Sequence, residues 1–234
     1  MSAIALRIGW RHIRGLGDKT REALQHARDE APFTSIADVV KRAKLTRAEA
    51  LHLARAGALE AFEPGRRKAA WEALRAAGDL LPLAPAHTLP FDPRELNEQE
   101  LVFLDYIATG ISVNGHPMQY LRARLEAAGI ASSRDMEEQY GDGERIVIAG
   151  LVVARQHPET AKGTVFLLLE DEFGYMNVIV PKPMYERYRE VVKFSTFIVI
   201  EGVFEREDRV MNVVGRRFRE LKTEKIIAHS RDFH

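Results

Sequence analysis

The sequence predicts an α+β protein in which helices fill the N-terminal half and a small β-barrel fills the C-terminal half. Two observations predict this class. Apolar residues recur at helical spacing up to about residue 128, and from Arg145 onward they alternate as they do in strands. A length of 234 residues is also sufficient for two hydrophobic cores.

The first residues alternate as a strand would, with Ile4, Leu6 and Ile8 on one side. They follow Met1 directly and have no pairing partner nearby in the sequence. We therefore expect this end to have been cut from a longer protein.

The turn Gly15-Leu16-Gly17 is the most informative stretch, and a helical pattern through Leu24 and Ala27 follows it. Glycines permit a sharp turn and a close ligand, and the first N–H groups of the next helix lack intrahelical partners. Such a turn binds phosphate without reading bases. The alternative is an ordinary glycine-containing turn between two helices. The predicted phosphate-binding residues of this helix-hairpin-helix are Arg14, Gly15, Leu16, Gly17, Lys19 and Arg21.

Two capping pairs predict the next two helices. Ser35 and Thr46 each precede a helical pattern and are followed three residues later by an acidic residue. Gly57 is placed to end the second of these helices. Residues 10–60 therefore hold two helix–turn–helix units in tandem. The second turn, residues 42–46, lacks glycine, so we expect it to pack against the first unit.

Three more helices are expected before the barrel, over residues 66–81, 97–110 and 118–128. Four prolines between Pro82 and Pro93 make that stretch the best linker candidate. The expected domains are a tandem helix-hairpin-helix region at 1–81, a proline-rich linker with connecting helices at 82–144, a barrel at 145–220 and a tail at 221–234.

The C-terminal patterns come in the order of three strands, one helix and two strands. This is the order of the five-stranded Greek-key barrel called the OB-fold, which binds oligonucleotides or oligosaccharides on its second and third strands. The expected strands cover residues 145–154, 164–170, 175–180, 197–204 and 210–217, and the expected helix covers residues 184–192.

The outer face of the second and third strands is the candidate single-strand site. Phe166 and Tyr175 share that face if Glu170 and Asn177 point outward. Exposed aromatic rings then form one platform on which bases of any sequence stack. With the basic residues of the first loop, the candidate single-strand-binding residues are Arg155, Lys162, Phe166 and Tyr175.

An alternative is that Phe166 and Tyr175 lie under the helical linker and that the barrel serves only for packing. The partly acidic loop at residues 205–209 favours this alternative. The basic residues from Arg216 to Lys225 favour binding.

The charges are unevenly placed along a chain whose net charge is zero. Residues 1–68 carry 14 Lys and Arg against 8 Asp and Glu, and residues 69–234 carry 20 against 26. The net charges are therefore +6 and −6, so the positive excess lies on the part that holds the hairpin. The chain has no cysteine, no signal peptide and no apolar run long enough to span a membrane, so we expect a cytoplasmic protein without membrane contacts.

No residue pattern predicts a catalytic, metal or cofactor site. Glu170-Asp171-Glu172 is followed by Phe173-Gly174, so we expect a hairpin turn there rather than a metal site. His116 precedes Pro117 and is expected to cap a turn. We expect no cofactor and no catalysis by this chain alone.

Several segments in this order resemble the C-terminal part of the bacterial C-family DNA polymerase III alpha subunit, and most closely its error-prone branch. They are Arg7-Ile8-Gly9, Gly15-Leu16-Gly17, Ala56-Gly57-Ala58-Leu59, Gly115-His116-Pro117-Met118, Ala161-Lys162-Gly163 and Leu169-Glu170-Asp171-Glu172-Phe173-Gly174. The resemblance covers essentially the whole chain. It implies that residues 1–60 hold duplex DNA and that residues 145–217 lie near single-stranded template. The family's palm, with its catalytic aspartates, has no counterpart among these residues.

The leading hypothesis is sequence-independent DNA binding for a catalytic polymerase region or subunit in replication and translesion repair synthesis. The alternatives are an interaction scaffold without DNA affinity and an RNA-binding OB protein. Gln99 to Phe103 resembles the sliding-clamp peptide of the replicative branch. Leu101 and Phe103 fall inside a periodic helix, so we expect core residues there and no clamp binding.

Overall fold

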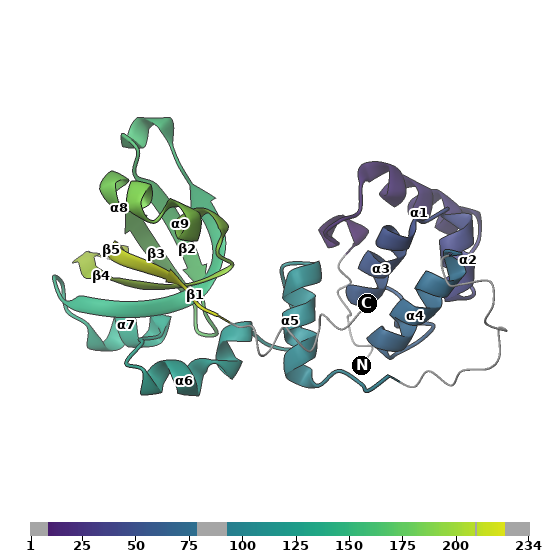
Figure 1. Cartoon of the computed structure of the whole chain (residues 1–234), viewed down its shortest axis with the longest axis horizontal. Helices are drawn as coiled ribbons and strands as arrows, with labels where there is room; N and C mark the ends of the chain where they lie inside the picture. Colours follow the sequence, from purple (N-terminus) through teal and green to yellow (C-terminus); the bar gives the residue numbers. More distant parts are fainter. Residues whose placement is uncertain (1–8, 79–92, 209, 223–234) are drawn as a thin grey trace. The chain divides into compact units, whose positions relative to one another are not determined.

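The computed structural model describes residues 9–78, 93–208 and 210–222 (Figure 1). The chain forms two compact units, and the division falls between Asn114 and Gly115. The expected strand at Ile4 to Ile8, most of the proline-rich stretch and the tail beyond Lys222 lie outside the described residues.

The first unit is helical throughout its described part. The capping pairs are confirmed: the Ser35 side chain accepts a hydrogen bond from the Asp38 amide, and Thr46 forms a reciprocal capping box with Glu49. Gly57 follows the latter helix with φ +73°, a left-handed conformation that ends helices. The elements are η1 (Trp10–His12), α1 (Asp18–Glu30), α2 (Ile36–Arg42), α3 (Arg47–Arg55), α4 (Arg66–Ala76) and α5 (Glu98–Ala108).

The core of this unit consists mainly of leucines and alanines. Leu16, Leu24 and Leu53 are buried together with Ala69 and Ala73 of α4. Small side chains on the buried face of α4 let it pack closely against α2 and α3. α4 ends at Ala76, earlier than the helix expected over residues 66–81, because Gly78 takes a left-handed conformation with φ +86°.

A buried ion pair attaches α5 to the helices before it. A guanidinium nitrogen of Arg66 lies 2.5 Å from a carboxylate oxygen of Asp105, and each side chain is 9% exposed. Arg66 also binds Glu60 at 2.8 Å and the Arg55 carbonyl at 3.0 Å. Phe103 of α5 is buried, as expected for a core residue.

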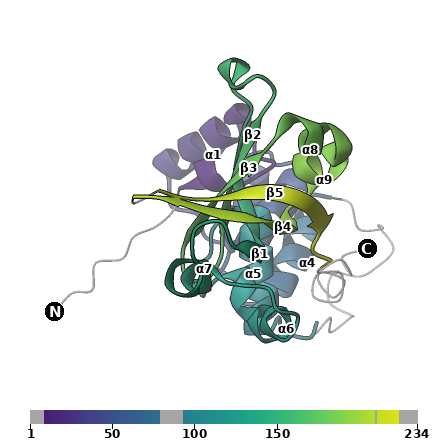
Figure 2. The same cartoon turned by 90° about the vertical axis from the view of Figure 1, so that its left-hand side faces the viewer.

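The second unit is a closed barrel with strand order β1-β2-β3-β5-β4. Neighbouring strands are antiparallel except for the parallel pair β3–β5, and two short helices lie between β3 and β4 (Figures 1 and 2). The predicted OB-fold is confirmed. The single helix expected over residues 184–192 is instead two short helices, because the backbone leaves the helical conformation at Tyr188. The elements are η2 (Pro117–Tyr120), α6 (Arg122–Ala127), α7 (Ser133–Gln139), β1 (Arg145–Gln156), η3 (Glu159–Ala161), β2 (Val165–Glu170), β3 (Tyr175–Val180), α8 (Lys182–Arg187), α9 (Arg189–Phe194), β4 (Phe197–Glu207) and β5 (Val210–Glu220).

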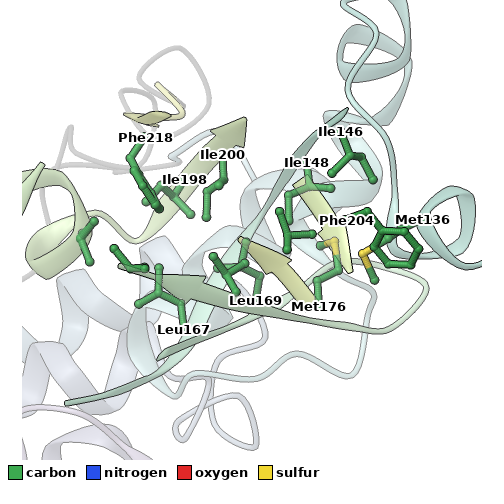
Figure 3. Packing of buried hydrophobic residues seen from close by; sticks show 14 of the residues in the cluster. Met136, Ile146, Ile148, Leu167, Leu169, Met176, Ile198, Ile200, Phe204 and Phe218 are labelled. Carbon is green, nitrogen blue, oxygen red and sulfur yellow. The ribbon is translucent and has the colours of Figure 1, made fainter. Parts of the chain in front are cut away.

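Residues from every strand meet inside the barrel (Figure 3). Met136 of α7 belongs to the same cluster as Phe204 of β4. α7 is an unexpected helix, although Ser132 and Asp135 form a capping box at its start. The described part of the expected linker region, residues 93–144, is divided between the units: α5 belongs to the first unit, and α6 and α7 belong to the second.

Asp171 ties the hairpin between β2 and β3 to α6 and α7. Its carboxylate accepts hydrogen bonds from the Ser133 amide and hydroxyl and from the amides of Phe173 and Gly174. Arg122 lies 3.3 Å from Asp171 and 2.6 Å from Glu172. The expected hairpin turn at these acidic residues is confirmed.

Replacing Asp171 with alanine should destabilise the second unit by about 3 kcal/mol or more, because it leaves buried donors and part of a buried guanidinium without partners. Both tryptophans, Trp10 and Trp71, lie in the first unit. In guanidinium titrations the far-ultraviolet circular dichroism transition should therefore shift while the tryptophan fluorescence transition stays in place. Glu138→Ala, at an exposed position of α7, is the control. An unshifted dichroism transition for Asp171→Ala would contradict the prediction.

Candidate nucleic-acid interface

The first hairpin is shaped by two glycines with different roles. Gly15 has φ +85°, and a Cβ there would overlap the His52 ring. Gly17 has φ −75°, and a Cβ there would meet nothing within 4 Å. Gly15 is therefore required by the fold, whereas Gly17 leaves open space in front of α1. The Leu16 side chain is buried, so only its backbone is available to a ligand.

The start of α1 carries no side-chain cap. Gly17 is its N-cap residue and makes no cap hydrogen bond through a side chain. The first intrahelical bond runs from the Arg21 amide to the Gly17 carbonyl, so the amides of residues 18–20 have no intrahelical acceptor. These donors, at the positive end of the helix dipole, face the open space that Gly17 leaves.

The second hairpin has the same backbone but is closed by its own side chains. Lys44 is left-handed with φ +51°, Leu45 is buried and Thr46 is the extended N-cap residue of α3. Here the Glu49 carboxylate accepts the Thr46 amide at 2.8 Å, and the Thr46 hydroxyl accepts the Glu49 amide at 3.4 Å. The second hairpin therefore offers fewer open donors than the first.

Glu49 also connects the two hairpins, because it accepts a hydrogen bond from the Thr20 hydroxyl of α1. Burial raises the pKa of the Glu49 carboxyl, but the hydrogen bonds from Thr20 and Thr46 outweigh that effect and bring the pKa below its ordinary value. The capping box was readable from the sequence. Its link to Thr20, and the packing of His52 under Gly15, were not.

The three predicted cations of the first hairpin have different surroundings. The Arg14 amide donates to the Ala108 carbonyl at 2.8 Å, and its guanidinium lies 3.5 Å from the Ile107 carbonyl. Arg21 pairs with Asp18 at 2.6 Å. Lys19 is exposed in the first turn of α1 and forms no ion pair with any residue of the described chain.

The outer face of β2 and β3 has the predicted phase. Phe166 and Tyr175 are exposed by 38% and 62%, while their sequence neighbours Val165 and Met176 are buried. Phe166 lies opposite Ile179, however, and Tyr175 lies opposite Glu170. The two rings are therefore four residues apart along the strands, about 13 Å at the usual rise of a strand. They lie at opposite ends of one face, so the expectation of a single platform is wrong.

The basic residues around the barrel are partly engaged. Arg155 donates to the carbonyls of Val192 and Ser195, so it fixes the end of α9. Lys162 is exposed and left-handed, with φ +51°. On β5, Arg217 pairs with Glu201 at 3.5 Å. Arg209 and Lys225, two further residues of the charge analysis, lie outside the described residues.

The comparisons with known proteins agree with this geometry. Residues 2–69 match the family model of the helix-hairpin-helix motif. The error-prone DNA polymerase of Anaeromyxobacter dehalogenans strain 2CP-C is 40% identical over 240 residues, which cover 99% of this chain and 21% of that protein. The error-prone DNA polymerase of Corynebacterium efficiens is 38% identical over 97% of this chain and 21% of its own length.

The chain is homologous to the C-terminal part of error-prone DNA polymerases. It spans about a fifth of the length of the relatives it matches. Among solved structures, asparaginyl-tRNA synthetase from Pyrococcus horikoshii is similar with a TM-score of 0.30 and 20% identity, over 36% of this chain and 21% of that chain.

Other candidate sites have structural roles in the described chain. The His116 ring accepts the Met118 amide at 3.1 Å, which confirms it as a cap. Among the described residues no cluster of three or more histidine or acidic side chains could hold a metal ion. The described helices include none that is both long and apolar enough to cross a membrane.

The two hairpin glycines should respond differently to substitution. Gly15→Ala should lower the free energy of unfolding of the first unit by about 2 kcal/mol or more, because alanine is strained at positive φ and the His52 ring must move. Gly17→Ala should cost less than about 1 kcal/mol, the loss of a favourable N-cap residue. Tryptophan fluorescence during guanidinium unfolding measures both. Equal losses would contradict the assignment of separate roles.

Proposed function

We propose that this chain is the DNA-holding part of an error-prone DNA polymerase. In this proposal the first hairpin binds duplex primer-template through its phosphates, and the outer face of β2 and β3 binds single-stranded template. The uncapped start of α1, within a helix-hairpin-helix match, is the observation that carries the proposal. The chemistry of nucleotide transfer would be supplied by the polymerase region, and this chain would supply affinity and position.

The duplex contact rests on three features of the first hairpin. The amides at the start of α1 provide donors, Gly17 leaves room for a phosphate, and Lys19 adds an exposed charge. Since the capping box of Thr46 and Glu49 occupies two amides at the start of α3, the first hairpin would make the main phosphate contact. Such contacts are independent of base sequence and weaken with salt.

The variant Gly17→Asp tests the duplex contact separately from stability. Aspartate is a good N-cap residue, so α1 should be as stable as before or more stable. Its side chain would take the amides that we assign to phosphate and would add a repelling charge. We expect duplex affinity to fall at least about tenfold in fluorescence anisotropy titrations at low salt. Unchanged affinity in a folded Gly17→Asp protein would contradict a phosphate contact at the first hairpin, and a wild-type chain that does not bind duplex would favour the scaffold alternative.

A lysine pair provides a matched control for charge. Lys19→Gln in the first hairpin should weaken duplex binding and lower the salt slope by about one. Lys44→Gln makes the same change in the second hairpin and should have a smaller effect. Equal effects of both variants would show that the hairpins contribute alike, contrary to the proposal.

The single-strand contact rests on exposed rings at both ends of the β2–β3 face. Phe166→Ala and Tyr175→Ala should each lower affinity for oligo(dT) by about 1–3 kcal/mol, the range for loss of one base stack. Phe173→Ala removes a ring that is 42% exposed at the hairpin tip, where it packs against Arg134, and serves as the control. Tighter binding of oligo(U) than of oligo(dT) would favour the RNA alternative, and wild-type affinity of both variants would contradict the stacking sites.

A further inference from the structure

A crevice lies at one end of the barrel, between the loop that joins β1 to β2 and the helices α8 and α9. Figures 1 and 2 both show η3 of this loop and the two helices at the same end of the barrel. Two adjoining hollows of about 100 and 190 Å³ make up this loop–helix crevice, and His157 and Tyr185 line both of them.

The walls of the loop–helix crevice are strongly basic. Four cationic side chains line it and one acidic side chain, Glu186, accompanies them. This is unusual in residues 69–234, whose net charge is −6. Arg155 donates hydrogen bonds to carbonyl groups, but its positive charge is not neutralised by them. The cationic side chains are Arg155, Lys182, Arg189 and Lys193.

Two rings form the centre of the crevice. The centroids of His157 and Tyr185 are 5.3 Å apart and their planes are inclined by 53°. Aromatic surface beside cations suits a ligand that has flat rings and negative charges, as a nucleotide has. A cluster of cations alone would suit any anion.

The crevice lies next to the Phe166 end of the β2–β3 face. Gln156, which lines the smaller hollow, is the register partner of Phe166. If a base of single-stranded nucleic acid stacks on Phe166, the adjacent nucleotide can therefore reach the crevice. The helices between β3 and β4 would then extend the binding path beyond the two strands of the sheet face.

We propose that the loop–helix crevice binds the sugar-phosphate backbone and one base of single-stranded nucleic acid as it leaves the β2–β3 face. This inference rests on the single-strand binding proposed above. Lys182, Arg189 and Lys193 contact phosphates, and a base lies against His157 and Tyr185. These residues extend the site beyond the four predicted from the sequence.

A pair of arginines near the junction of α8 and α9 tests the proposal. Arg189 lines the crevice, whereas Arg187, two residues earlier and also exposed, does not. Both are changed to glutamate in the full chain, and affinity is measured by anisotropy for oligo(dT) of about 4 and about 12 nucleotides. Arg189→Glu should weaken binding of the longer oligonucleotide at least about fivefold and lower its salt slope, with less effect on the shorter one. Arg187→Glu should bind with an affinity near that of wild type. His157→Ala should lower the affinity for the longer oligonucleotide without changing the salt slope.

The other outcomes are distinguishable. Equal losses of oligo(dT) affinity for Arg189→Glu and Arg187→Glu would overturn the proposed role of the crevice. If that affinity still depends on Phe166, the proposed single-strand function is unaffected. Failure of the wild-type chain to bind either oligonucleotide would overturn both. Competition by thymidine triphosphate or inorganic phosphate at concentrations that equal those of oligonucleotide phosphate would identify a site for free anions and would overturn the assignment to a strand.

Discussion

Both units depend on the pairing of buried arginines with carboxylates from distant parts of the sequence. Arg66 binds Asp105, 39 residues away, and Arg122 binds Asp171 and Glu172, about 50 residues away. A guanidinium taken out of water is costly unless it is paired, so each arginine admits few arrangements of the surrounding helices. This constraint makes α5 part of the helical unit, and it makes α6 and α7 part of the barrel unit.

A second constraint decides which polar groups remain available. Three of the five α-helices in the described part of the first unit have side-chain caps, at Ser35, Thr46 and Asn97, whereas α1 and α4 have none. The start of α1 is left open behind Gly17. The two hairpins have similar backbones but differ in their internal hydrogen bonds. The hairpin before α3 is capped by its own side chains, whereas the hairpin before α1 leaves amides that a phosphate could bind. The same distinction applies to the barrel, where Arg155 holds α9 in place and Lys162 is exposed.

These features support a division of labour in which affinity comes from backbone donors, exposed cations and aromatic rings. None of these groups reads base sequence, which suits a protein part that must follow DNA of any sequence. The acidic balance of the second half does not oppose this interpretation, because cations are concentrated locally at the loop–helix crevice. Local charge, and not the total, is what a bound strand meets.

The sequence by itself determined the order of the five barrel strands, the capping pairs at Ser35 and Thr46, the glycine hairpin and the inward and outward phase of β2 and β3. These are local properties, set by spacing, turn chemistry and side-chain alternation. The tertiary structure decided what depends on distant residues. It separated the functions of Gly15 and Gly17 through His52, placed Phe166 and Tyr175 at opposite ends of one face through the strand register, and brought Lys182 and Arg189 beside His157. No local pattern encodes these arrangements, because each depends on residues that are distant in the sequence and come together only when their own unit folds.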